Sequence, residues 1–333
     1  ERWIETVAHW RQMNAPLLET VDGDSLPDPN TTYLLYQTLL GTWPLRPLSN
    51  DQRAEYRDRI AQYMQKATRE GKSHTSWINP SESFEHAVTQ LVARLVESEE
   101  AAAFREQMDA LAKAIAAAGY LNGLSQTLLK ATLPGVPDFY QGSEYWDFNL
   151  VDPDNRRPVD FERRRASLAD LQQGLANPGA AFLEQLLERW PAPEIKQFVV
   201  WRALACREAH PELFAEGDYV PLPAAGPLAE HVFAFGRRWQ NQWLVVAIPR
   251  HIQRFTQAES ATAPGTILAA DWQDTRIELP EDAPSEWQNQ WTAQLLSAAS
   301  AGGVSHLAVA ALFSPLPLML LTGSSPAGAP SAE

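Results

Sequence analysis

Aromatic rings alternate with charged side chains along one stretch of the chain, residues 133–161. The side chains concerned are Asp138, Phe139, Tyr140, Glu144, Tyr145, Trp146, Asp147, Phe148, Asp152, Asp154, Arg156, Arg157, Asp160 and Phe161. A pyranose offers an apolar face and a rim of hydroxyl groups, so rings beside carboxylates and guanidinium groups suit a sugar-binding surface. This stretch is therefore the first candidate for a binding site.

The stretch begins as a predicted strand and continues as a long loop. Val136 to Tyr140 form an apolar run bracketed by Pro134-Gly135 and Gln141-Gly142, which predicts a short strand. About twenty residues without a regular period follow, and a loop of that length in a globular chain is usually functional or disordered. The aromatic rings argue against disorder, because unstructured segments lack such apolar surface.

The composition limits the class of protein. With 333 residues, 45% of them hydrophobic and 20% charged, the chain can form two domains or one large one around a sizeable core. A formal net charge of -14 disfavours a nucleic-acid partner and is compatible with a neutral substrate. The single cysteine, Cys206, excludes an internal disulfide framework and fits a reducing compartment.

The hydropathy and the first residues predict a location. The sequence contains no apolar run near the roughly 20 residues that a membrane helix needs, and Glu1-Arg2-Trp3 does not begin a signal peptide. We therefore expect a cytoplasmic protein with no membrane partner. The chain starts in a helical pattern without an initiator methionine, which predicts a piece of a longer protein.

Helical patterns dominate the residues up to 210. Ser49 and Gln52 predict a capping box for a helix that Gly71 would end in a left-handed conformation, while Asn30 and Asn79 are predicted N-caps. The predicted helices are Thr31–Leu40, Asp51–Glu70, one beginning at Pro80, Ala102–Ala118, Leu121–Thr132 and Leu168–His210. Several long helices leading into one strand are typical of the last part of a (β/α)8 barrel with helical insertions.

Short β-rich runs replace this pattern from Pro211 onward. The predicted strands are Tyr219–Leu222, His231–Arg237, Trp243–Ile248, Thr266–Ala269, Thr275–Leu279, Leu307–Leu312 and Leu316–Leu321. Evenly spaced short strands indicate an antiparallel sandwich.

Several motifs resemble a known family. The run Pro134 to Glu144 resembles the last barrel strand of the alpha-amylase superfamily, glycoside hydrolase family 13. The run Leu150 to Asp160 is similar to a narrower group, the maltooligosyl trehalose synthase family. Asp28-Pro29-Asn30, Tyr33 to Gly41, Trp43-Pro44 and Leu213 to Tyr219 also resemble segments of that family. The resemblance thus covers nearly the whole chain.

The resemblance implies an α/β plus all-β fold. Residues 1–210 would form the C-terminal part of a catalytic (β/α)8 TIM barrel with helical insertions, and residues 211–322 an antiparallel β-sandwich domain. The Ser-, Pro-, Ala- and Gly-rich residues 323–333 would form a disordered tail.

The resemblance also implies an activity, the conversion of the reducing-end α-1,4 linkage of a maltooligosaccharide into an α,α-1,1 linkage. Retaining enzymes of this kind use two carboxyl groups about 5 Å apart. In this superfamily they lie on the fourth and fifth barrel strands, with a third Asp after a His on the seventh. All three would precede Glu1, and the sequence contains no His-Asp dipeptide. We therefore assign no catalytic residue, expect the chain to be inactive without the missing N-terminal part, and expect no cofactor or metal.

The candidate substrate contacts form two clusters. Lys72 to Trp77 match a Lys-x-x-Thr-Ser-Trp pattern that family members keep before a helix, and the second cluster is the loop that begins at Tyr140. The predicted substrate-binding residues are Lys72, His74, Trp77, Tyr140, Gln141, Glu144, Trp146, Asp152, Asn155, Arg156 and Arg157.

Each candidate also has a purely structural interpretation. Trp77 can anchor a core, and Asn79 is favoured as a helix cap only. Glu144 can hydrogen-bond loop backbone or pair with an arginine of the loop, while Asp154 and Asn155 can merely shape a turn.

Two other functions stay open. The chain can be a non-catalytic module that binds oligosaccharide or only supports the barrel, or it can belong to another family-13 α-glucan hydrolase or transferase. The run Val151 to Asp160 argues against the second of these. The sequence contains no dinucleotide-binding, Walker or HExxH motif, and no spacing typical of a zinc site.

Overall fold

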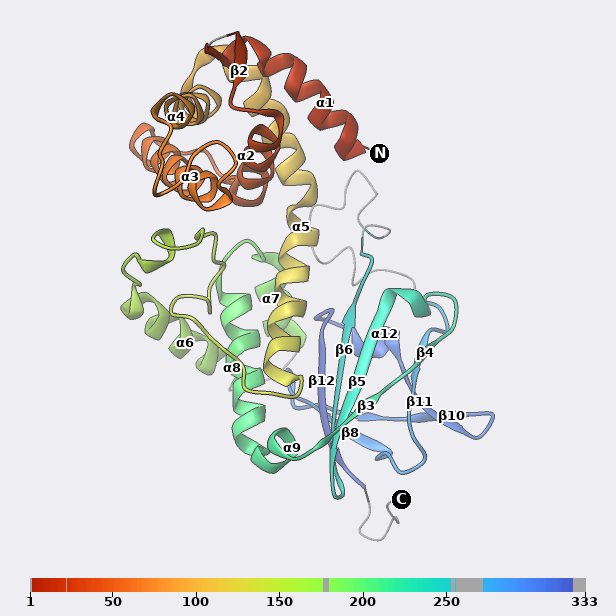
Figure 1. The fold of residues 1–333 in the computed structure, drawn as a ribbon. Coiled ribbons are helices and arrows are strands. Elements are labelled where there is room, and N and C mark those ends of the chain that lie inside the picture. Colours follow the sequence, from red (N-terminus) through yellow and green to blue (C-terminus); the bar gives the residue numbers. More distant parts are fainter. Residues whose placement is uncertain (1, 22, 176–179, 253–254, 256–271, 326–333) are drawn as a thin grey trace. The chain divides into compact units, whose positions relative to one another are not determined.

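The computed structural model describes residues 2–21, 23–175, 180–252, 255 and 272–325 (Figure 1). It divides into two compact units: residues 1–115 together with 148–158, and residues 116–147 together with 159–333. The boundary between the units falls within one long helix, α5, which spans Ala102–Thr132. Each unit is described by itself.

The first unit is a set of helices with one small hairpin. Its elements are α1 (Arg2–Asn14), β1 (Glu19–Val21), β2 (Asp24–Leu26), α2 (Pro29–Thr42), α3 (Asn50–Gly71), α4 (Glu82–Glu97) and the start of α5. Trp10 lies fully buried at the centre, with ring centroids 5.5 Å from Tyr36 and 5.1 Å from Phe104. Edge-to-face rings at these distances stabilise a core beyond the area that they bury. The indole of Trp10 on α1 thereby packs against both α2 and α5.

Capping explains where α2 and α3 begin. The predicted capping box is confirmed, since the side chain of Ser49 accepts from the backbone of Gln52 and the Gln52 side chain reaches back. The predicted cap at Asn30 is wrong. Asp28 accepts the N–H of Asn30 at 2.9 Å instead, because Pro29 occupies the first helical position and leaves the preceding carboxylate free to cap.

The end of α3 and the start of α4 also differ from prediction. Lys72, not Gly71, takes the left-handed conformation, with φ at 57°. The helix α4 starts at Glu82 rather than Pro80, so Asn79 is not its cap. The reason is a turn before the helix, in which the hydroxyl of Thr75 accepts the N–H of residue 81 at 2.9 Å.

One further correction concerns α5. The two predicted helices, Ala102–Ala118 and Leu121–Thr132, are one continuous helix. Gly119 lies between the two predicted helices, but a single helical glycine costs only about 1 kcal/mol. The buried Leu121, Leu124 and Leu128 offset that cost.

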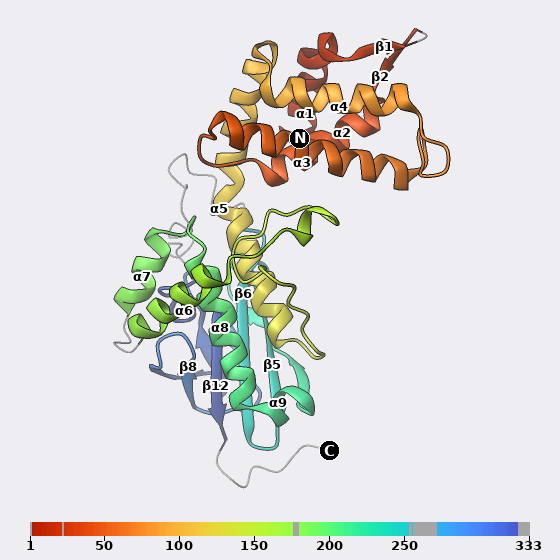
Figure 2. The same ribbon diagram turned by 90° about the vertical axis from the view of Figure 1, so that its left-hand side faces the viewer.

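The second unit combines helices with two antiparallel sheets (Figure 2). Where one helix was predicted over Leu168–His210, there are three, α6 (Phe161–Leu175), α7 (Ala180–Glu188) and α8 (Glu194–Ala209), followed by the short α9 (Pro211–Ala215). Pro191 and Pro193 stand between α7 and α8 and oppose a continuous helix. The predicted division at residues 210 and 211 stays a prediction.

The larger sheet has six strands in the order β3-β5-β6-β12-β8-β9. The bounds are β3 (Asp218–Pro221), β5 (Val232–Trp239), β6 (Gln242–Pro249), β12 (Met319–Ser324), β8 (Glu286–Asn289) and β9 (Leu295–Ser297). The smaller sheet has the order β10-β11-β7-β4, with β10 (Ala299–Ala301), β11 (Val304–Ala308), β7 (Arg276–Glu278) and β4 (Ala224–Ala225). The predicted combination of helices with antiparallel strands is confirmed.

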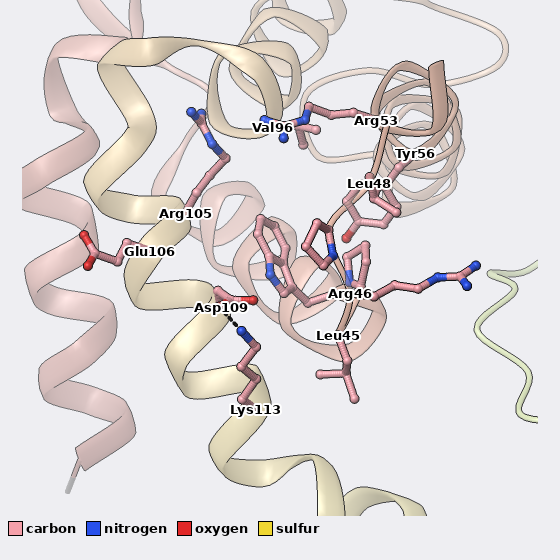
Figure 3. A pocket seen from close by; sticks show the side chains of 13 residues that line it. Leu45, Arg46, Leu48, Arg53, Tyr56, Val96, Arg105, Glu106, Asp109 and Lys113 are labelled. Atoms are coloured by element: carbon pink, nitrogen blue, oxygen red, sulfur yellow. Dashed lines mark hydrogen bonds and ion pairs between the residues drawn. The ribbon is translucent and has the colours of Figure 1, made fainter. Parts of the chain in front are cut away.

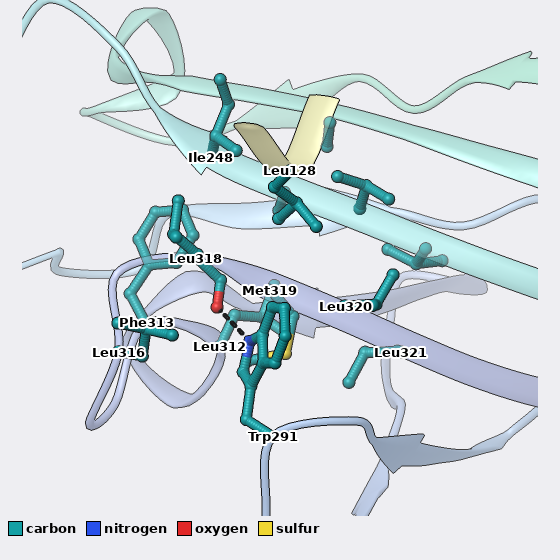
Figure 4. Packing of buried hydrophobic residues seen from close by; sticks show 14 of the residues in the cluster. Leu128, Ile248, Trp291, Leu312, Phe313, Leu316, Leu318, Met319, Leu320 and Leu321 are labelled. Carbon is teal, nitrogen blue, oxygen red and sulfur yellow. Dashed lines mark hydrogen bonds between the residues drawn. The ribbon is translucent and has the colours of Figure 1, made fainter. Parts of the chain in front are cut away.

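Helices α5 and α8 lie side by side against the larger sheet in Figures 1 and 2. Leu128 of α5 reaches the core formed by Leu318, Met319, Leu320 and its neighbours (Figure 4). The indole N–H of Trp291 donates to the carbonyl of Leu318 at 2.6 Å, which satisfies a polar group buried within this core. The sheet and its helices therefore share one hydrophobic core.

The prediction of a strand over Val136–Tyr140 is wrong. The structure assigns no strand to these residues, and Val136 is 95% exposed. A strand forms only where a neighbour supplies its backbone hydrogen bonds, and the sheets of the described residues do not include this segment.

Three other predicted segments differ from the structure or lie outside the described residues. The run Leu307–Leu312 is divided between β11 and a short helix, α12 (Val309–Leu312). The predicted tail begins too early, since β12 continues through Ser324, and residues 326–333 lie outside the described residues. The predicted strand Thr266–Ala269 also lies outside them.

Candidate functional site

In the first unit, the loop 148–158 is fixed by one arginine of α3. The guanidinium group of Arg59 donates to both carboxylate oxygens of Asp154, each at 2.9 Å, and to the carbonyl of Phe148 at 3.0 Å. The same carboxylate accepts the N–H of Leu150 at 2.7 Å. Bidentate pairs of this kind fix orientation as well as distance. Asp154 thus determines the path of the loop rather than presenting a charge to a ligand.

The pKa of Asp154 reflects these contacts. Burial alone would raise it, but the hydrogen bonds from Arg59 and Leu150 and the nearby guanidinium charges of Arg59 and Arg157 outweigh burial. The pKa of the carboxyl group therefore lies below its ordinary value, and the group is ionised at neutral pH.

Two more residues of α3 hold the same loop. Lys66 donates to the carbonyl of Asp152 at 2.8 Å, and Glu55 pairs with Arg157 at 2.8 Å. Arg59 lies about one turn after Glu55, and Lys66 about two turns after Arg59, which places all three on one face of the helix. The polar side chains on this face of α3 hold the loop 148–158 in place.

Arg156 and Asn155, two predicted contacts in this loop, differ in how far they are exposed. The side chain of Arg156 is 71% exposed, although it pairs with Asp152. The amide oxygen of Asn155 is buried and has no hydrogen-bond donor among the described residues. An unsatisfied buried acceptor costs about 1–3 kcal/mol. Arg156 is therefore better placed to meet sugar hydroxyls than Arg157, which is held by two carboxylates, whereas the buried amide oxygen of Asn155 is closed to a ligand in this arrangement of the loop.

The turn after α3 carries the other candidates of this unit. Trp77 is 58% exposed, so it is not a core anchor, and the guanidinium carbon of Arg69 lies 4.8 Å from its ring centroid. The ring of His74 stacks on Phe84 at 4.7 Å, and its Nε2 lies 3.3 Å from a carboxylate oxygen of Asp28. Trp77 therefore presents an open aromatic face, whereas His74 is partly engaged by the protein.

Glu85 holds this turn against α3 and α4. Its carboxylate accepts from Arg69 at 2.7 and 2.6 Å, from the hydroxyl of Thr75 at 2.6 Å and from Gln65 at 3.1 Å. The bond from Arg69 is the largest influence, opposed by burial and reinforced by the bonds from Thr75 and Gln65. Together they lower the pKa of Glu85 from 4.5 to about 2.

This pKa predicts an acid-dependent loss of stability. Since the folded-state pKa is lower than that of the unfolded chain, the contribution of Glu85 is complete above pH 4.5 and is lost as the pH falls toward about 2. We expect Glu85→Gln to make the free energy of unfolding of this unit less dependent on pH between those values. Chemical denaturation at a series of pH values, followed by hydrogen exchange of α4 amides, measures this. The control Glu82→Gln, an exposed residue of the same helix, should leave the dependence as it is.

In the second unit, the segment 133–147 packs beside α6 and α8. Glu144 forms an ion pair with Arg164, whose guanidinium carbon lies 4.3 Å from the ring centroid of Tyr145. The indole N–H of Trp146 donates to a backbone carbonyl at residue 192 (3.0 Å), and Lys196 lies 5.8 Å from its ring centroid. Glu144 and Trp146 therefore have structural partners.

Tyr140 and Gln141 differ from these neighbours, because both are exposed. Tyr140 keeps 46% of its surface accessible, while its backbone carbonyl accepts from Ser143 and closes the turn behind it. They are the two predicted contacts of this unit that are open to a ligand.

Sequence reasoning missed the residues that support these segments, namely Arg59, Lys66, Glu85, Arg164 and Lys196. The only signal was the polar face of α3, because the partners of Arg59 and Lys66 lie far along the chain. The described residues contain no group of three or more His, Cys, Asp and Glu side chains that could hold a metal ion. They also form no helix long and apolar enough to cross a membrane.

The chain is similar in sequence and in fold to known proteins. Putative maltooligosyl trehalose synthases of two Mycobacterium tuberculosis strains are 35% identical over 295 residues, which is 89% of this chain and 32% of theirs. The solved structure of maltooligosyltrehalose synthase from Arthrobacter ramosus matches 96% of this chain and 34% of its own, with 31% identity and a TM-score of 0.67. A hypothetical maltooligosyl trehalose synthase of Sulfolobus tokodaii, 24% identical with a TM-score of 0.58, supports the fold alone; it is matched over 97% of this chain and 35% of its own. No family model matches the chain.

The chain spans about a third of the length of the proteins that it matches. It is homologous to a part of the maltooligosyl trehalose synthases.

Proposed function

We propose that the chain is a C-terminal portion of an enzyme that converts the reducing-end α-1,4 linkage of maltooligosaccharides into an α,α-1,1 linkage. The observation that carries this proposal is 35% identity over 89% of the chain to proteins named for that reaction. The substrate would be a maltooligosaccharide, and the product a maltooligosyl trehalose. We keep a cytoplasmic location as part of the proposal.

We also propose the finer architecture that the resemblance implies. Residues 1–210 would complete a (β/α)8 barrel with helical insertions, and residues 211–322 would form a β-sandwich domain. The exposed, unpaired segment around Val136 supports this proposal, because an apolar stretch that is 95% exposed at its valine lacks the neighbours that a barrel strand requires.

The catalytic carboxylates would come from the part of the enzyme that precedes these residues. Retention needs a nucleophile and an acid about 5 Å apart, and we assign neither role here. In the proposed reaction the nucleophile displaces the terminal glucose as the acid protonates the leaving oxygen, giving a glycosyl-enzyme. The released glucose then attacks through its anomeric hydroxyl, which returns its proton to the same group. No water is consumed and no cofactor is required.

This chain would hold and orient the released glucose. A bound acceptor reacts far faster than one in solution, and exclusion of water prevents hydrolysis of the glycosyl-enzyme. Trp77 would provide an aromatic platform, with Lys72 and His74 as hydrogen-bond donors beside it. Arg156 would contact hydroxyl groups.

The other candidates divide into exposed residues and residues that other parts of the chain already hold. Tyr140 and Gln141, which are exposed, would contact sugar directly. The paired residues would shape the surfaces that carry these contacts: Glu144, Trp146, Asp152 and Arg157.

Counting reducing ends tests the proposed reaction. The longest natural polypeptide that contains these residues is incubated with maltopentaose, and reducing ends and anomeric linkages are followed by colorimetry and proton NMR. Loss of reducing ends with the appearance of an α,α-1,1 linkage is expected. A gain in reducing ends would instead identify a hydrolase, and no change would identify a non-catalytic module; either result would refute the proposed function.

A further inference from the structure

A pocket of about 320 Å³ opens in the first unit, where the α2–α3 connection faces α5 (Figure 3). Trp43 and the buried Tyr56 form an apolar wall, with ring centroids 6.2 Å apart. Asp109 and Lys113 line it from successive turns of α5 and pair with each other at 2.7 Å. The volume lies at the lower end of the range of small-molecule sites.

Three arginines line the same pocket, Arg46, Arg53 and Arg105, and none of them pairs with a carboxylate within the described part of the chain. Arg46 extends away from the other two in Figure 3. Arg53 forms no ion pair or side-chain hydrogen bond within the described part of the chain, and Arg105 bonds there only to the backbone carbonyl of Ser98. Other arginines of α3 differ, since Arg57 and Arg59 both pair with carboxylates. In a chain with a net charge of -14, three arginines in one pocket without a carboxylate partner call for an explanation.

Arg53 and Arg105 oppose each other electrostatically. Burial and the positive charge of Arg53 lower the pKa of Arg105, and the carboxylate of Glu99 only partly counters them. Arg53 thus disfavours the charged form of Arg105 as long as no anion lies nearby. An anion bound there would remove that penalty and gain charge-assisted hydrogen bonds.

We propose that this pocket binds the phosphate group of a small phosphate monoester, with the ring of the ester against Trp43. A phosphate dianion accepts from two guanidinium forks at once, which a single carboxylate does less well. The apolar wall beside the arginines favours a ligand that carries a ring. Hexose phosphates and nucleoside monophosphates share this chemistry, and the site is independent of the proposed reaction.

Titration calorimetry distinguishes these ligands. The longest natural polypeptide that contains these residues is titrated with glucose 6-phosphate, adenosine monophosphate, inorganic phosphate, and the uncharged parents glucose and adenosine. Saturable binding of at least one monoester at one site per chain is expected, with its parent much weaker. Because a tenfold change in affinity corresponds to about 1.4 kcal/mol, a change that loss of one guanidinium contact readily produces, we expect Arg53→Gln and Arg105→Gln each to weaken binding about tenfold or more.

The control is Arg165→Gln, which removes the same charge from an exposed arginine of the other unit and should change nothing. Arg53→Gln should not lower the thermal unfolding midpoint, because that side chain has no bonded partner among the described residues to lose and its charge repels Arg105. The proposal is overturned if no monoester binds saturably at millimolar concentration, if the uncharged parents bind equally well, or if the control weakens binding as much as the pocket variants.

Discussion

Replacing Arg59 by methionine should lower the free energy of unfolding of the first unit by about 2–3 kcal/mol. The substitution keeps the apolar stem but removes the partner of Asp154, whose side chain is 8% exposed. Among the described residues, only Arg157, 3.2 Å away, would then still pair with this carboxylate, and loss of the main partner of so buried a charge is strongly destabilising. Chemical denaturation combined with hydrogen exchange of α3 and loop amides measures the loss.

Arg57→Met is the matched control on the same helix. Arg57 pairs with Asp58 and Glu97, but these side chains are 57% and 32% exposed, so its loss should cost less than about 1 kcal/mol. Asp154→Asn combined with Arg59→Met should cost less than the sum of the two single substitutions, since both remove the same interaction. Equal effects of the two arginine variants would show that the loop does not depend on Asp154.

Leu128→Ala should destabilise the second unit by about 3 kcal/mol. Leu128 is fully buried where α5 meets the core of the larger sheet (Figure 4). Truncation of a leucine in such a position loses the transfer free energy of the removed atoms and leaves a cavity that the sheet fills only in part. Hydrogen exchange of β6 and β12 amides reports the resulting increase in opening.

Leu295→Ala provides the same chemical change at a side chain that is 69% exposed. It should change the free energy of unfolding by less than about 0.5 kcal/mol. If both leucine variants had similar effects, α5 would not be a part of this core.

Much of the local structure could be predicted from the sequence, because its causes are local. The capping box of Ser49 and Gln52 needs only residues three apart, and the β-rich runs of β5 and β6 are strands in the structure. The errors arise where local rules compete. Asn30 and Asp28 are both good caps, and Pro29 decides between them. Val136 to Tyr140 have a strand composition, but a strand also needs a partner.

The candidate site was harder to predict, because its geometry depends on distant pairs. Nothing near Asp154 in the sequence indicates that Arg59 would hold it, and the interpretation of Asp154 as a shaper of the loop followed from turn propensity alone. Trp77 shows the opposite case, since only the structure reveals that 58% of its surface stays open. Composition identifies which residues suit a sugar, whereas packing decides which of them are free to bind one.

Binding of maltopentaose tests most directly whether this part of the enzyme contacts sugar. Titration calorimetry on the longest natural polypeptide that contains these residues should show saturable binding. Trp77→Ala and Arg156→Ala should each weaken it, the former about fivefold, because an aromatic platform contributes on the order of 1 kcal/mol. Arg165→Ala is the control, because the side chain of Arg165 is 70% exposed and that of Arg156 is 71% exposed. It should leave the affinity for maltopentaose unchanged. Unchanged affinity in both variants, measured on folded protein, would contradict the account and leave these residues with a structural role only.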